Sequence, residues 1–321
     1  MLGAALHIAD KAPLLEKYDG IIVTDLFNLA DFKALAGPQC PPVLAYFHEN
    51  QMTYPQPPGD KGAFHLGIIN ITTALVADMV VFNSKMHKDA FLNAVPEFLK
   101  KGRDFGPKGI AEKIREKADV LYPGITLPDV GDVDAEKQIN PPLIIWNHRW
   151  GFDKNCKMFF SAIYEIDNMG LDFNLALMGE NFGKIPEEFK EAKKKLKGRI
   201  LQFGYVPLRQ QYEKWLKRGA IVISTTIQEN FGISVIESML MGCVPLLPDR
   251  LSYPEIIPEE FHEHFLYKSR QDLIEKLFLL ISDYKRYEEI QSSLAKKMRS
   301  FLWENVISGY DRALERLAII R

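Results

Sequence analysis

The sequence predicts an α/β protein built from two doubly wound domains, in which helices cover both faces of parallel sheets. Short apolar runs alternate with longer amphipathic stretches of helical period, as expected for repeated strand–helix units. The runs lack polar alternation, which is typical of strands that are buried on both faces. The chain has 321 residues, more than one ordinary hydrophobic core supports, and this length favours two domains.

The predicted strands fall into two groups around a segment rich in Pro, Gly and Asp, residues 123–142, which has the composition of a linker. Residues 1–130 are expected to form the first domain and residues 131–300 the second. Residues 301–321 are expected to form a terminal helix that packs back toward the first domain. Strands of the first domain are expected at residues 19–25, 41–48, 77–84 and 118–124. Strands of the second are expected at residues 142–148, 173–180, 199–205, 220–226 and 243–249.

Segments of helical length separate the strands. Residues 154–170 are one example, and Gly170 is suited to the left-handed C-cap that ends many helices. Residues 284–321 predict one or two long helices, because apolar side chains recur there with helical spacing. That apolar face is expected to pack against the core.

The composition excludes several classes of protein. The hydrophobic content of 47% suffices for a core in each domain, and the formal net charge of −2 does not favour a general polyanion binder. The three cysteines, Cys40, Cys156 and Cys243, show no C-x-x-C spacing, which indicates a reduced, cytoplasmic protein without a disulfide framework or a zinc site. No apolar run approaches ~18 residues, so no membrane span is expected.

Two glutamates, Glu229 and Glu237, flank a glycine turn that follows the predicted strand at 220–226. Ligands of open parallel sheets bind at the carboxyl ends of the strands, so this loop is expected at the ligand edge. Gly232 permits close backbone approach. The N–H groups from Phe231 to Ser234, at the start of the next helix, form an anion site that suits a diphosphate.

The order of these groups matches the parts of a sugar nucleotide. Glu229 lies beside the anion site and is suited to accept hydrogen bonds from sugar hydroxyls, while Glu237 is suited to accept them from ribose hydroxyls. The alternative is a helix with two solvated glutamates. The residues predicted to bind the donor are Gly179, Glu180, Asn230, Phe231, Gly232, Ile233 and Glu237.

Two cations follow the first strand of the second domain. Arg149 and Lys154 lie in the loop after residues 142–148, again at the carboxyl edge. Two positive charges there would neutralise a diphosphate leaving group as its charge develops, and a surface salt-bridge pair is the alternative. Gly179 follows the next strand and is suited to close approach of the donor to the backbone.

The second half of the chain resembles the retaining glycosyltransferases of family four, which have the GT-B fold. The glutamate pair around the Phe-Gly turn matches the donor motif of that family, and Arg149 and Lys154 match its cation pair. The resemblance implies two Rossmann-like domains facing a cleft and metal-independent transfer with retention of configuration. We therefore expect no metal and no cofactor beyond the sugar-nucleotide donor. Family members begin with a strand and a glycine-rich loop upstream of the segment that opens this chain, so the first domain is expected to lack its first strand.

A narrower resemblance includes the first domain. Four stretches resemble the queuosine-tRNA mannosyltransferase family: LAYFHENQMTYP (residues 44–55), LVADMVVFNS (75–84), NHRWGFDKN (147–155) and YPEIIPEEF (253–261). That resemblance implies transfer of mannose from GDP-mannose to queuosine in tRNA-Asp.

His48 ends the second predicted strand and is expected to hydrogen-bond the transferred sugar or to assist charge development, with a structural hydrogen bond as the alternative. Glu49, Asn50 and Gln51 follow it and are expected to bind sugar or acceptor hydroxyls, although Asn50 and Gln51 equally suit a loop-shaping role. Ser84 is a further candidate on the acceptor side. The predicted catalytic residues are His48, Arg149, Lys154 and Glu229.

Residues 83–117 carry nine Lys or Arg and five Asp or Glu, a local excess of four positive charges in a chain that is net acidic. Such a segment is suited to contact tRNA phosphates, and a solvated helix and loop is the alternative. The residues expected to form this basic patch are Lys100, Lys101, Arg103 and Lys108.

Two other functions remain open from the sequence. The same donor motifs serve enzymes with a lipid or polysaccharide acceptor, and a chain without the glycine-rich loop also fits a non-catalytic sugar-nucleotide or RNA-binding protein. A dehydrogenase is disfavoured because no G-x-G-x-x-G follows a predicted strand. The sequence indicates neither the oligomeric state nor the choice of GDP over UDP in the donor.

Overall fold

The computed structural model describes residues 3–12, 14–56, 64–102, 106–126, 137–181 and 183–320. The chain divides into two compact units, one of Met1–Gly124 with Val306–Arg321 and one of Ile125–Asn305. The end of the chain therefore belongs to the first unit. The predicted boundary between residues 130 and 131 lies outside the described residues.

The first unit is built on a sheet of four parallel strands. The order across the sheet is β1 (Ile21–Thr24), β2 (Val43–Phe47), β3 (Met79–Phe82) and β4 (Ala118–Val120). Because right-handed crossovers that progress in one direction place all their helices on one face, the connecting helices share a side of this sheet. They are α2 (Leu29–Ala36), α3 (Phe64–Val76), α4 (Lys85–Lys100) and α5 (Ile110–Arg115). Helix α1 (Ala4–Lys11) precedes β1 and packs against α2.

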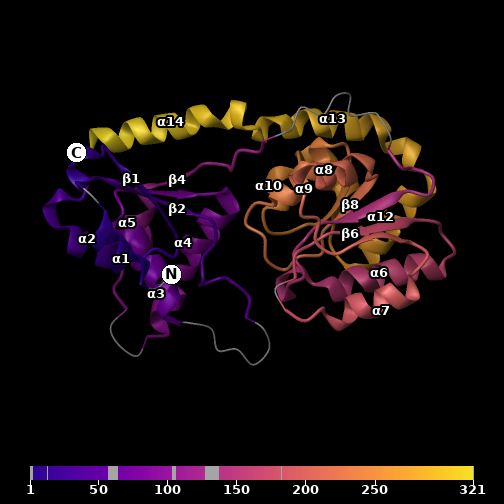
Figure 1. Ribbon diagram of the computed structural model, residues 1–321, viewed down its shortest axis with the longest axis horizontal. Helices are drawn as coiled ribbons and strands as arrows, with labels where there is room; N and C mark the ends of the chain where they lie inside the picture. The colour runs from indigo at the N-terminus through magenta and orange to yellow at the C-terminus, as the bar shows by residue number, and fades with distance from the viewer. Residues whose placement is uncertain are drawn as a thin grey trace. The chain divides into compact units, whose positions relative to one another are not determined.

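The two faces of this sheet have separate hydrophobic cores. Val43, Ala45 and Phe47 of β2 pack with the connecting helices. The alternate residues Leu44 and Tyr46 face the other way and pack with Ala313 and Leu317 of α14 (Trp303–Ile319). Figure 1 shows α14 on the face opposite α1–α5. The order β1-β2-β3-β4 does not reverse, so the first sheet is parallel but is not doubly wound as the sequence predicted. The end of the chain supplies the helix of its second face.

The second unit contains a sheet of six parallel strands in the order β10-β9-β8-β5-β6-β7. The order reverses at β5, which is the doubly wound arrangement predicted from the sequence. Every strand expected from the sequence is present, and β10 was missed because it has only two residues. The strands are β5 (Leu143–Trp146), β6 (Asn174–Leu177), β7 (Ile200–Phe203), β8 (Ile221–Ile223), β9 (Val244–Pro248) and β10 (Leu266–Tyr267).

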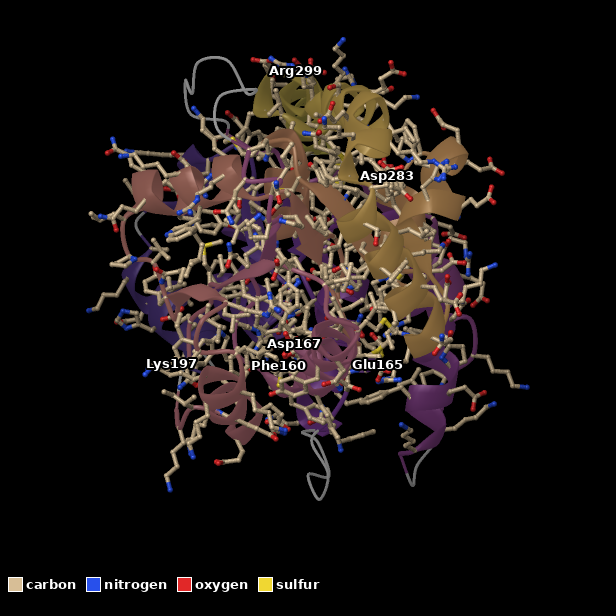
Figure 2. All side chains as sticks on the ribbon, turned by 90° about the vertical axis from the view of Figure 1, so that its right-hand side faces the viewer. Phe160, Glu165, Asp167, Lys197, Asp283 and Arg299 are labelled. Atoms are coloured by element: carbon tan, nitrogen blue, oxygen red, sulfur yellow. The ribbon has the colours of Figure 1, made fainter. Side chains whose placement is uncertain are left out.

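Helices cover both faces of this second sheet. On one side, α6 (Cys156–Asn168) contacts α7 (Glu187–Lys195) and α12 (Arg270–Ser282). On the other side, α9 (Ile233–Leu240) contacts α8 (Arg209–Arg218) and α13 (Glu288–Met298). In Figure 2, Glu165 and Asp167 of α6 lie toward the bottom of the view, whereas Arg299, which ends α13, lies toward the top. The short helices α10 (Tyr253–Ile256) and α11 (His262–Phe265) follow β9.

The reversal of strand order positions the site. Neighbouring strands β5 and β8 pair through Ile144 with Ile221 and Ile145 with Val222. The chain leaves these two strands toward opposite faces of the sheet, and in open α/β sheets ligands bind beyond the carboxyl ends of such a strand pair. Both motifs singled out in the second half of the sequence follow these two strands. Among the described residues, no helix combines the length and the apolar character needed to span a membrane.

Candidate functional site

The loops after β5 and β8 are hydrogen-bonded to each other at the point where the strand order reverses. The carbonyl of Asp153 accepts hydrogen bonds from the Ile227 amide at 2.8 Å and the Thr226 hydroxyl at 3.0 Å. The Thr225 hydroxyl donates to the carbonyl of Lys154 at 3.0 Å. These bonds hold the backbone that carries the predicted cations against the backbone that carries the predicted glutamate motif.

A buried carboxylate joins the two predicted cations. Asp153 is 4% exposed, and its Oδ1 lies 2.9 Å from Nη2 of Arg149, while its Oδ2 lies 3.3 Å from Nζ of Lys154. Nζ of Lys154 also lies 3.1 Å from Oε2 of Glu229 and donates to the carbonyl of Gln228. Lys154 is only 9% exposed, so the alternative of a surface salt-bridge pair does not describe it. The structure brings Arg149, Lys154 and Glu229 together.

Sequence reasoning missed Asp153, although it lies between the two cations. Its spacing of four residues from Arg149 was the available signal. Gly151 makes the contact between them possible, because a Cβ atom at that position would lie 2.6 Å from Oδ1 of Asp153 and 3.0 Å from Nη1 of Arg149.

The helix after the glycine turn begins as predicted. Gly232 has φ +95°, a left-handed conformation that other residues adopt only with strain, and α9 follows it. No side chain caps this helix N-terminus, so its partial positive charge remains for an anion. Ile233 is half-exposed at the first helical position, whereas the Phe231 ring is buried against Phe301 at 5.4 Å. Only the backbone of Phe231 is thus placed to contact a donor. Asn230 is buried, and its Oδ1 accepts from the side-chain Nε2 of Gln228 at 3.1 Å.

Glu237 is not solvated, which contradicts the alternative of two solvated glutamates. It is 9% exposed, its Oε1 lies 2.7 Å from Nη1 of Arg209, and its Oε2 accepts from the Tyr212 hydroxyl at 3.2 Å. Asn147, at the end of β5, donates to that same hydroxyl at 2.9 Å. No local pattern in the sequence linked Arg209, Tyr212 or Asn147 to Glu237.

Packing against the neighbouring loop already requires a glycine at position 179, and contact of the donor with its backbone stays a prediction. A Cβ atom at Gly179 would lie 1.9 Å from the carbonyl oxygen of His148, so the neighbouring loop already fills that space. The carbonyl of Glu180 accepts from the Trp150 amide at 2.8 Å, which holds the same two loops together. The Glu180 side chain is exposed, and its contact with a donor stays a prediction.

His148 supports the loop of Arg149 from inside the protein. It is almost fully buried, and its ring packs edge-on against Trp146 at 5.2 Å. Burial, with a further contribution from the Lys154 charge, lowers the pKa of His148 from 6.5 to about 3. The imidazole is therefore neutral at physiological pH.

This buried histidine predicts a loss of stability in mild acid. Below pH 6.5 the unfolded chain binds a proton at His148, whereas the folded chain binds it only near pH 3. The free energy of unfolding should therefore fall as the pH is lowered between these values, by about 1.4 kcal/mol per pH unit from this group. Urea unfolding of the wild-type chain and of His148→Asn at pH 7.5, 6 and 5 measures the effect. A pH dependence equal in both proteins would contradict it.

In the first unit, the loop after β2 is anchored by the residues that directly follow β1 and β3. His48 donates its amide to Oδ1 of Asp25 at 3.1 Å, and its carbonyl accepts from Asn83 at 2.9 Å. The imidazole itself is exposed and lies 4.6 Å from the Tyr46 ring. Burial of part of the ring lowers the pKa of His48. The predicted position of His48 at the carboxyl edge is confirmed, while its catalytic role stays a prediction.

Two residues expected to bind the acceptor have structural partners instead. Asn50 is fully buried, and its Oδ1 accepts from the amides of Met52 and Thr53, so it shapes the loop. Ser84 is fully buried and caps α4 by accepting from the amide of His87 at 3.0 Å. With no surface to present, neither is placed to touch an acceptor.

Glu49 and Gln51 are partly exposed and hydrogen-bonded to each other at 3.1 Å, and their acceptor role stays a prediction. Sequence reasoning missed the fully buried Asn70, which accepts from the amide of Gln51 and donates to the carbonyl of Asp25. Asn70 therefore joins the loops after β1 and β2.

The predicted basic patch lies at the end of α4 and beyond it. Lys100 pairs with Glu97, Lys101 lies 5.7 Å above the Phe98 ring, and Lys108 is exposed. Arg103 lies outside the described residues. Within the part of the chain that the structure describes, no cluster of three His, Cys, Asp or Glu side chains is arranged to hold a metal ion.

Comparisons with solved structures support the predicted GT-B fold class of two parallel-sheet α/β domains. TarM has a TM-score of 0.72 at 14% identity, over 97% of this chain and 57% of TarM. Sucrose-phosphate synthase from Thermosynechococcus elongatus has a TM-score of 0.75 at 14% identity, over 95% of this chain and 75% of that protein. HepE from Anabaena, solved with UDP, has a TM-score of 0.70 at 17% identity, over 97% and 82% of the two chains. At these identities the likeness concerns the fold alone.

Sequence comparisons identify the family. Residues 1–125 match the model of the tRNA-queuosine alpha-mannosyltransferase N-terminal region, and residues 132–297 match the model of glycosyl transferases group 1. The tRNA-queuosine alpha-mannosyltransferase of Drosophila melanogaster is 34% identical over 289 residues, which are 86% of this chain and 74% of the relative. The chain therefore belongs to the tRNA-queuosine alpha-mannosyltransferase family, with a group 1 glycosyltransferase domain in its second unit.

Proposed function

We propose that this chain transfers mannose from GDP-mannose to queuosine in tRNA, as a retaining glycosyltransferase of family four that needs no metal ion. The observation that carries the proposal is the cluster of Arg149, Asp153, Lys154 and Glu229 beside the uncapped N-terminus of α9. The Drosophila relative is named for transfer of mannose to queuosine in tRNA, which supports the sugar and the acceptor.

The donor diphosphate binds at the first turn of α9, where backbone N–H groups and the helix dipole favour an anion. Arg149 and Lys154 stabilise the negative charge that grows on the diphosphate as the bond to the sugar breaks. Asp153 holds both cations before the donor arrives, so little reorganisation is needed during the reaction.

Glu229 and Glu237 bind the two ends of the donor. Glu229 lies beside Lys154 and orients the mannosyl hydroxyls, and Glu237 accepts hydrogen bonds from the ribose. No carboxylate is assigned as a nucleophile. In a retaining transfer of this kind the acceptor hydroxyl attacks the face from which the diphosphate departs, and its proton passes to a leaving-group oxygen.

The first unit carries the acceptor side in this proposal. His48, Glu49 and Gln51 contact the transferred sugar or the queuosine hydroxyls, and the basic patch at Lys100, Lys101 and Lys108 contacts tRNA phosphates. We place the reaction in the cytoplasm, in keeping with three cysteines that are all free thiols.

The proposal is tested by incubating the chain with GDP-mannose and queuosine-containing tRNA, digesting the RNA and measuring hexosylated queuosine by mass spectrometry. We expect a hexose adduct with the wild-type chain and at least a hundredfold less with Glu229→Ala or Arg149→Ala, since each removes part of the donor site. The same tRNA with guanine in place of queuine is the control and should give no adduct.

Two outcomes would contradict separate parts of the proposal. If GDP-mannose binds by calorimetry but no adduct forms, the acceptor is a different molecule. If GDP-mannose does not bind, the donor assignment is wrong.

A further inference from the structure

Two residues of α8 bind the carboxylate of Glu237, one at each oxygen. Arg209 is the first residue of that helix, and its Nη1 lies 2.7 Å from Oε1 of Glu237. Tyr212, one turn further on, donates its hydroxyl to Oε2 at 3.2 Å. Each oxygen of the carboxylate therefore has its own donor. We call Asn147, Arg209 and Tyr212 the Glu237 clamp.

Within this clamp, Asn147 connects Tyr212 to the end of β5. The two hydrogens of its Nδ2 are shared among the Tyr212 hydroxyl at 2.9 Å, the carbonyl of Ser234 at 2.9 Å and the hydroxyl of Ser238 at 3.0 Å. Burial and the neighbouring Glu237 raise the pKa of Tyr212, so its hydroxyl keeps its proton. The hydrogen bonds thus run in one direction, from Asn147 through Tyr212 to Glu237.

Arg209 lies at the N-terminus of α8, where a positive charge destabilises the helix. The N-terminus of a helix carries partial positive charge, which repels a guanidinium. Two buried carboxylates, Glu213 and Glu237, compensate for this repulsion by accepting from Nε and Nη1 of Arg209. The position of Arg209 therefore favours its ion pair with Glu237, although it is unfavourable for the dipole of α8.

The geometry leaves a defined pair of acceptor positions on Glu237. An ionised carboxylate offers about four lone-pair sites, two on each oxygen. Arg209 occupies one site on Oε1 and Tyr212 occupies one on Oε2, so one remains on each oxygen. Two acceptor sites side by side match the two neighbouring hydroxyls of a ribose.

We propose that Arg209 and Tyr212 are positioning residues that aim Glu237 at the 2′- and 3′-hydroxyls of the donor ribose. This inference rests on the proposed function, because it assumes that a nucleoside diphosphate occupies the site. The clamp acts through Glu237 and makes no contact with the reacting atoms.

The test compares the binding of GDP and of 2′,3′-dideoxy-GDP by calorimetry. We expect the wild-type chain to bind GDP at least tenfold more tightly, since removing the hydroxyls leaves a charged acceptor without partners. In Tyr212→Phe and Arg209→Met the preference should fall to about threefold or less, through weaker binding of GDP alone. Arg209→Lys, which keeps the charge, should restore part of it. Lys214→Met, on the same helix and in none of these contacts, should leave it unchanged.

Four results would overturn this inference. Equal weakening of both nucleotides in Tyr212→Phe would mean that the clamp only supports the fold, and an unchanged preference in that variant would mean that it does not position Glu237. If the wild-type chain binds both nucleotides equally, Glu237 does not bind the ribose hydroxyls, and the proposed function is unaffected. A wild-type chain that binds neither would instead contradict the proposed function itself, and the inference with it.

Discussion

Replacing Lys154 with methionine is expected to lower the rate of mannosyl transfer on the order of a thousandfold. Methionine has nearly the same length but no charge, so the diphosphate loses a buried cation as its negative charge develops, an effect of about 3–4 kcal/mol in comparable sites. The loss also leaves Glu229 and Asp153 without the ammonium group that lies 3.1 and 3.3 Å from them. The measurement is the initial rate of hexose addition to queuosine at saturating GDP-mannose.

Lys157→Met is the matched control for this variant. Lys157 is an exposed residue of α6, three positions further along the chain, and it takes part in none of the contacts at the site. It should retain the wild-type rate. Thermal unfolding of both variants separates a catalytic effect from a loss of fold. A folded Lys154→Met chain with a rate within tenfold of wild type would show that Lys154 does not stabilise the leaving group.

Replacing Gly179 with alanine is expected to lower the free energy of unfolding of the second unit by about 3 kcal/mol, because the added methyl group overpacks two loops. Its Cβ atom would lie 1.9 Å from the carbonyl oxygen of His148 and 2.9 Å from the Trp150 ring, and backbone must shift to admit it. Since His148 precedes Arg149, the same shift should reduce activity. Urea unfolding measures the stability, and the transfer assay measures the activity.

Gly183→Ala tests the same substitution in the same loop without the clash. Nothing lies within 4 Å of a Cβ atom at Gly183, so its unfolding free energy should change by less than about 0.5 kcal/mol. The two variants distinguish packing from ligand approach at Gly179. A Gly179→Ala chain with unchanged stability and weakened GDP binding would support donor approach, not packing, as the role of that glycine.

The sequence by itself determined the strands, the two domains and the residues at the ligand edge of the second sheet. A buried parallel strand is an apolar run that can be recognised from its own residues. The residues directly after it lie at the carboxyl edge of the sheet, whatever the position of the strand in the sheet. The spacing of Glu229, Phe231, Gly232 and Glu237 is local for the same reason. The helix start at Ile233 needed no tertiary information.

Only the tertiary structure decided which side chains meet. Asn147 and Ser238 are 91 residues apart, and Lys154 and Glu229 are 75 apart, so no local periodicity relates them. The pairing of Tyr46 with Tyr310 on α14 spans 264 residues. Strand order places β8 beside β5, and that pairing creates the contacts of Asp153 and Lys154 with the loop after β8.

The same reason explains the wrong assignments. Composition and spacing report which residues are polar, small or charged, but burial of a polar side chain depends on the elements that close around it. Asn50 and Ser84 follow strand ends, as a ligand-binding residue does, yet their hydrogen bonds go to the backbone of the next turn. At Gly179 the sequence shows a glycine but not its packing reason, which is a carbonyl of the neighbouring loop that leaves no room for a Cβ atom.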